Sequence, residues 1–131
     1  MKLELWQQRL LSKIKKTDFE ENKERICAEF RKLCEPFVGY KDSTFEGNSL
    51  RVNNEIYTLQ VDTNDIIIKY SKDGANPIES KCSLKGKYSR MTINYYISGE
   101  LDSSLTVGDS ANYSLDYEDI LNKLMRMIIG V

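Results

Sequence analysis

The chain contains no histidine. Histidine is the usual general base near neutral pH and the commonest metal ligand in proteins. Its absence excludes Ser-His-Asp and Cys-His hydrolases, His-ligated zinc sites and histidine phosphorelays. No other catalytic motif takes their place. We therefore expect a protein that binds rather than catalyses, with no cofactor and no metal site.

Cysteine and long apolar runs are also scarce. The three cysteines are an odd number, which argues against a disulfide framework. Cys27 and Cys34 are separated by roughly 10 Å along a predicted helix, which is too far for a disulfide. The longest apolar runs, such as Ile66-Ile67-Ile68, are too short to span a bilayer, and the amino terminus lacks a signal sequence. We expect a cytoplasmic protein with reduced thiols and no membrane partner.

Length and composition indicate one soluble domain over residues 1–131, since 40% of the residues are hydrophobic and 30% are charged. The net charge is −1, from 19 basic and 20 acidic residues. A molecule with that balance has no general attraction for a nucleic acid polymer. The high Lys, Ile and Asn content is typical of AT-rich genomes, and it indicates a bacterial or phage origin.

Helical periodicity marks both ends of the chain. Apolar residues recur at helical spacing from Leu3 onward, and a second series from Phe19 to Phe37 is out of phase with the first. Thr17 to Glu20 matches a capping box, which predicts a break near Thr17 and a helix that ends before Pro36. One bent helix over 1–37 is the alternative. A closing amphipathic helix is expected over 115–129, starting near Ser114 or Asp116.

The middle of the chain, residues 49–107, is typical of an antiparallel meander. Predicted strands cover 49–52, 55–62, 65–71, 78–85 and 88–98, with a shorter sixth strand at 100–107. Asn53-Asn54 and Thr63-Asn64 fit two-residue hairpin turns, and Gly86 marks a later turn. The predicted fold is therefore α+β. It consists of an amino-terminal helix or helix pair, a sheet of five or six strands, and a carboxy-terminal helix packed on one sheet face.

A basic cluster is the main candidate binding site. Residues 69–90 are rich in lysine, whereas residues 98–119 carry acidic residues and no basic ones. Strand alternation places several of these cations on the outward face of the sheet, where they could hold phosphate groups beside a tyrosine. The candidate ligand-binding residues are Lys69, Lys81, Lys85, Arg90 and Tyr96. The competing interpretation is that these lysines only keep the open face soluble.

The amino-terminal apolar stripe, formed by Leu3, Trp6 and Leu10, is the candidate interface. The only tryptophan of the chain lies within it, and tryptophan is enriched at binding hot spots. The stripe could mediate self-association or contact a protein partner. Alternatively, Trp6 packs on the sheet of its own chain.

These features predict a non-enzymatic binding protein, an inhibitor or immunity-like interaction factor that acts as an oligomer. The layout of elements resembles that of small bacterial and phage inhibitors and immunity proteins, without a shared residue motif. The alternative is a protein that sequesters a small anionic, nucleotide-type ligand on the basic face and its tyrosine.

Overall fold

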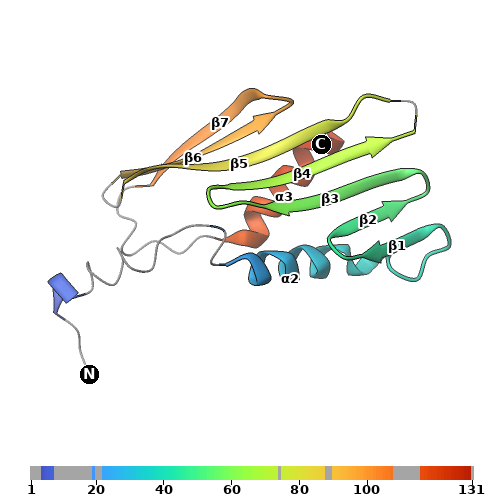
Figure 1. Cartoon of the computed structure of the whole chain (residues 1–131), viewed down its shortest axis with the longest axis horizontal. Coiled ribbons are helices and arrows are strands. Elements are labelled where there is room, and N and C mark those ends of the chain that lie inside the picture. The colour runs from blue at the N-terminus through green and yellow to red at the C-terminus, as the bar shows by residue number, and fades with distance from the viewer. Residues whose placement is uncertain are drawn as a thin grey trace.

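The computed structural model describes residues 4–7, 19, 22–73, 75–87, 90–107 and 116–130, with the side chains of 86, 87, 90, 91 and 107 excepted. Within these ranges the fold is α+β, as predicted: an antiparallel sheet with one helix before it and one after it (Figure 1). Residues 5–7 are also helical. No helix in the described part of the chain is long and apolar enough to cross a membrane.

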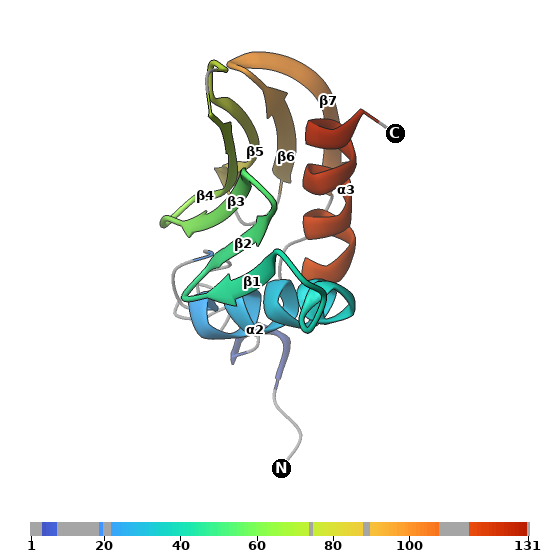
Figure 2. The same cartoon turned by 90° about the vertical axis from the view of Figure 1, so that its right-hand side faces the viewer.

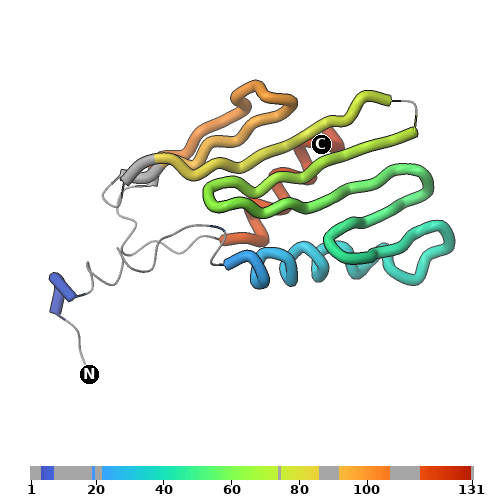
Figure 3. Tube along the Cα trace, in the orientation of Figure 1, coloured from blue at the N-terminus to red at the C-terminus, as the bar shows by residue number. Residues whose placement is uncertain are grey.

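The sheet has seven strands, one or two more than predicted, and their spatial order follows the chain from β1 to β7. Figure 3 shows the trace turning back on itself between β2 and β3 and between β3 and β4. Every neighbouring pair is antiparallel. The strands are β1 (Ser43–Glu46), β2 (Ser49–Val52), β3 (Glu55–Val61), β4 (Asp65–Lys72), β5 (Ile78–Lys87), β6 (Arg90–Ile97) and β7 (Glu100–Val107).

The turns between β2 and β3 and between β5 and β6 are predicted from the sequence. Asn53-Asn54 joins β2 to β3 as predicted, and Asn53 has a φ of 55°, a conformation that asparagine tolerates. The predicted turn at Gly86 is wrong. Strand β5 continues through Gly86, whose Cα partner is Met91, and it ends at Lys87. The connection to β6 therefore falls at residues 88–89, which lie outside the described residues.

The first helix starts later than predicted. Helix α2 (Lys23–Cys34) has Asn22 as its N-cap, so the capping-box pattern at Thr17 does not start it. Phe19 is fully buried outside the helix: its backbone N–H donates to the Thr63 carbonyl at 2.9 Å. The expected end before Pro36 is confirmed, because a short 3-10 turn, η1 (Glu35–Phe37), follows directly. The predicted break near Thr17 lies outside the described residues.

Helix α3 (Tyr117–Ile129) confirms the closing amphipathic helix, and it starts with Asp116 as N-cap. The Asp116 carboxylate accepts a hydrogen bond from the Asp119 N–H at 3.2 Å, which satisfies one of the free amide groups of the first turn. Gly130 ends the helix with a φ of 88°, in the left-handed region that favours glycine.

The core lies between the two helices and one face of the sheet. Figure 2 shows the curved sheet wrapping around α2 and α3. Helix α3 packs on β4, β5 and β6, while α2 packs on β3 and on α3. Alternate residues of the central strands point into this core and are fully buried, among them Ile66, Ile68 and Cys82. The opposite sheet face is therefore available for other roles.

Candidate functional site

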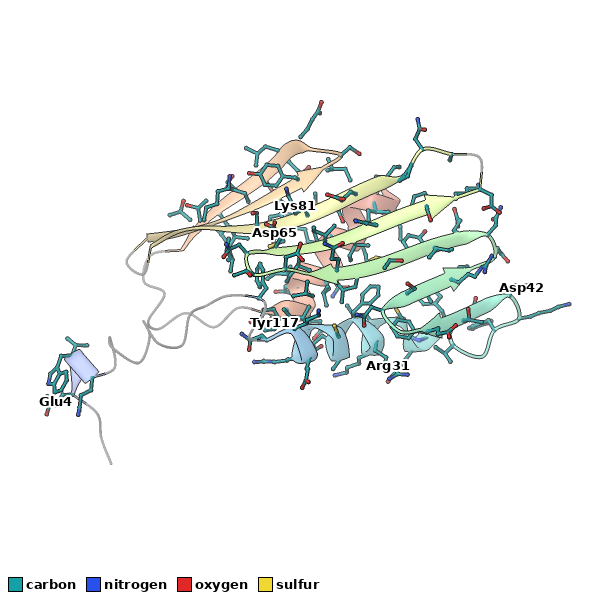
Figure 4. The ribbon with its side chains drawn as sticks, viewed as in Figure 1. Glu4, Arg31, Asp42, Asp65, Lys81 and Tyr117 are labelled. Atoms are coloured by element: carbon teal, nitrogen blue, oxygen red, sulfur yellow. The ribbon has the colours of Figure 1, made fainter. Side chains whose placement is uncertain are left out.

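The open face of the sheet is the one turned away from the helices. Lys69, Lys81 and Lys85 alternate with the buried residues Ile68, Cys82 and Leu84, so strand geometry directs them to this face. Figure 4 labels Lys81 on β5 and Asp65 on the neighbouring strand β4, in a view where α3 lies behind the sheet. No described helix covers these positions.

Lys81, Lys85 and Tyr96 form a cluster that we call the lysine–tyrosine cluster. Lys81 and Tyr96 are directly opposite each other on β5 and β6. The Lys81 ammonium lies 5.0 Å from the centre of the Tyr96 ring, and the Lys85 ammonium lies 5.9 Å from it. Both distances are within the range of cation–π attraction. The structure thus brings three of the five predicted ligand-binding residues together.

Neither lysine of this cluster forms an ion pair with a carboxylate of the described residues. Two acidic residues lie near the lysines on this face: Glu79, two residues before Lys81 on β5, and Asp65, the Cα partner of Ser83, which lies between the two lysines. The Ser83 hydroxyl donates to Asp65 at 2.5 Å. The site therefore carries two cations, with the hydrogen-bonded carboxylate of Asp65 on the β4 side and Glu79 before Lys81 on β5, and both ammonium groups lie toward Tyr96 on β6.

Lys69 lies beside this cluster without contacting it. Its Cα partners are Thr58 on β3 and Glu79 on β5, and its side chain is exposed. Because Lys81 pairs with Ile67, Lys69 is a diagonal neighbour of Lys81. The backbone of Arg90 pairs with Lys87 at the start of β6. The Arg90 side chain is not among those that the structure describes, so its role in ligand binding stays a prediction.

Sequence reasoning missed the polar and apolar groups that surround the cluster. The Ser104 hydroxyl donates to the Asn94 side-chain oxygen at 2.7 Å, which links β7 to β6 on the open face. Leu101, the Cα partner of Tyr96, is 60% exposed. Ile67 is only 7% exposed although it belongs to the same face. Alternation alone could have identified Ser83, but the pairing of Leu101 with Tyr96 depends on the register.

The predicted interface residues are only partly described. Trp6 is 61% exposed and its neighbour Leu5 is 64% exposed, so neither packs into the core. Figure 1 shows the helical turn that carries them at a distance from the sheet. This position contradicts the alternative in which Trp6 packs on the sheet. Leu3 and Leu10 lie outside the described residues, and their interface role stays a prediction.

Two of the three cysteines, Cys34 and Cys82, are buried, and Cys27 is partly exposed. All three are free. Burial raises the pKa of the Cys34 thiol to about 11 and that of Cys82 to about 12, which keeps both thiols protonated. Burial also raises the pKa of the half-buried Cys27. Among the described residues, no group of three cysteine or carboxylate side chains could hold a metal ion.

Comparisons with protein families, with curated proteins and with solved structures found no match for this chain.

Proposed function

We propose that this chain is a non-catalytic binding protein that sequesters a small anionic ligand of nucleotide type on the lysine–tyrosine cluster. One observation carries the proposal: two ammonium groups converge on one tyrosine ring, on an open sheet face, without a described acidic partner. Charge-assisted hydrogen bonds from such a pair would suit a phosphate group.

The surroundings favour a ligand with a charged end and an apolar end. Asp65 would repel a phosphate on the β4 side, so the phosphate is expected over β5 and β6. The exposed side chain of Leu101, in register with Tyr96, offers an apolar surface next to that position. A nucleobase could lie there while its phosphates contact Lys81 and Lys85. Both lysines lie on β5, an inner strand of the sheet that pairs with β4 and β6.

Isothermal titration of the purified chain with ATP, GTP and inorganic tripolyphosphate tests this proposal. Each charge-assisted hydrogen bond contributes about 1.5–3 kcal/mol, so Lys81→Gln with Lys85→Gln should weaken binding by at least about tenfold. Lys41→Gln is the matched control, because it removes an equivalent charge from an exposed loop position outside the sheet. Nucleotide binding without tripolyphosphate binding would indicate that the base contributes.

Two results would contradict the proposal. One is the absence of binding by the wild-type chain to all three compounds. The other is equal binding by the wild-type chain and the double variant, because the ligand would then contact a different surface.

A second candidate function is an interaction factor of the inhibitor or immunity type, and the exposure of Leu5 and Trp6 favours it. Large apolar side chains that are exposed on a protein surface are common at contacts with other proteins. If this segment mediates self-association, Trp6→Ala with Leu10→Ala should lower the mass in solution and leave the circular dichroism of the sheet unchanged. An unchanged mass would show that this segment does not mediate self-association.

A further inference from the structure

The two edges of the sheet differ in how they are protected. Strand β1, at one edge, has only four residues, and its Phe45 ring packs 6.0 Å from Phe30 of α2. Strand β7, at the other edge, has eight residues and contains neither lysine nor proline, the residues that commonly block edge pairing. No other described strand pairs with its outer side.

A β-bulge divides β7 into two parts. The register shifts between Tyr95 and Tyr96, so that Ser103 pairs with Tyr95 while Leu101 pairs with Tyr96. Asp102 is the extra residue, and Glu100 precedes it. The remaining segment, Ser103–Val107, pairs regularly with β6. The bulge and both acidic residues of β7, which hinder edge pairing, therefore lie at one end of the strand, outside the regular segment.

Leu105 lies at the middle of this regular segment. It pairs with Ile93, which is 1% exposed and belongs to the core face, yet Leu105 itself is 54% exposed. Ser104 and Thr106 flank it on the open face, in register with Asn94 and Thr92. The free edge thus presents an apolar residue on one face and two hydroxyl residues on the other.

We propose that β7 pairs antiparallel with β7 of a second copy of this chain along Ser103–Val107, with the two-fold axis at Leu105. Antiparallel pairing about this residue places Leu105 opposite its own symmetry mate and Ser104 opposite Thr106. Each face then meets a matching one: leucine with leucine on the core side, hydroxyl with hydroxyl on the open side.

Charge placement favours a second copy over an unrelated strand. In this arrangement the acidic pair Glu100 and Asp102 of each copy lies at the opposite end of the joined segment from the pair in the other copy. The Thr106 hydroxyl forms no hydrogen bond with any described residue, and in the pair it would face the Ser104 hydroxyl across the axis. The proposal does not depend on ligand binding, because none of the residues Ser103–Val107 belongs to the lysine–tyrosine cluster.

Sedimentation equilibrium of the full chain over a wide range of protein concentration tests the proposal. The wild-type chain should form a dimer. Leu105→Lys places two ammonium groups against each other at the axis, and it should raise the dimer dissociation constant by at least about tenfold. Leu101→Lys is the matched control: it adds the same charge to an exposed leucine of the same strand, outside the paired segment, and should leave the dimer intact.

A charge-swap experiment distinguishes loss of the dimer contact from misfolding of a variant. Leu105→Asp and Leu105→Lys should each be monomeric, and an equimolar mixture should recover the dimer, because opposite charges then meet at the axis. A monomeric wild-type chain, or a Leu105→Lys dimer as stable as wild type, would overturn the proposal. So would a dimer that only Trp6→Ala dissociates, since the contact would then be amino-terminal.

Discussion

Replacing Lys81 and Lys85 by glutamine should lower the free energy of unfolding by no more than about 1 kcal/mol. The variant loses two cation–π contacts, at 5.0 and 5.9 Å, which contribute about 0.5 kcal/mol each at an exposed site. It also loses a repulsion. Both ammonium groups lie over one ring and are at most about 11 Å apart, where like charges repel by about 0.4 kcal/mol in water. The expected net loss is about 0.6 kcal/mol, or a few degrees in Tm.

Urea unfolding followed by far-ultraviolet circular dichroism measures this change, with Lys41→Gln as the control for removal of a surface charge. A loss of about 3 kcal/mol or more would refute the reasoning, because it would match the cost of breaking a buried ion pair rather than that of losing exposed contacts. The lysines would then hold acidic groups of their own chain, and the proposed ligand would lose its binding site. A small change in stability together with lost nucleotide binding is the result expected under the proposed function.

Three further predictions concern the rest of the molecule. Phe19→Ala should cost about 3–5 kcal/mol in urea unfolding, because a fully buried ring is removed; a cost below about 1 kcal/mol would show that the core does not hold this ring. The Tyr70 hydroxyl donates to Glu55 at 2.6 Å, which raises the pKa of Tyr70 from 10.0 to about 12. This pairing stabilises the fold below pH 10 and is lost as the pH rises through about 12, and Glu55→Gln should return the pKa toward 10 in a spectrophotometric titration. Cys27 alone should react with Ellman's reagent in the native chain, since the other two thiols are buried, and three reactive thiols before denaturation would contradict this.

Much of the fold could be predicted from local patterns. The α+β class, the strands of the meander and the closing helix follow from periodicity, turn residues and caps, and these act over a few neighbouring residues. Strand β1 was missed because Ser43–Glu46 shows no extended apolar alternation. Its strand conformation comes from pairing with β2 and from the contact of Phe45 with Phe30, a residue distant in sequence.

Local signals failed where distant residues compete for the same segment. The capping-box pattern at Thr17 predicted a helix start, yet Phe19 is held outside any helix by its hydrogen bond to Thr63 and by edge contact with the Tyr117 ring at 6.3 Å. Burial of this ring stabilises the fold more than an added helical turn would. The start of α2 at Lys23 was therefore a tertiary outcome.

Part of the candidate site likewise follows from the sequence, and part follows from the tertiary structure. Sequence alone determined that Lys81 and Lys85 share one face of a strand, because side chains alternate with a period of two. It could not determine which residue of the next strand lies beside them, because a shift of the turn changes the register. Only the tertiary structure, with β5 extended to Lys87, places Tyr96 opposite Lys81 and within reach of both ammonium groups.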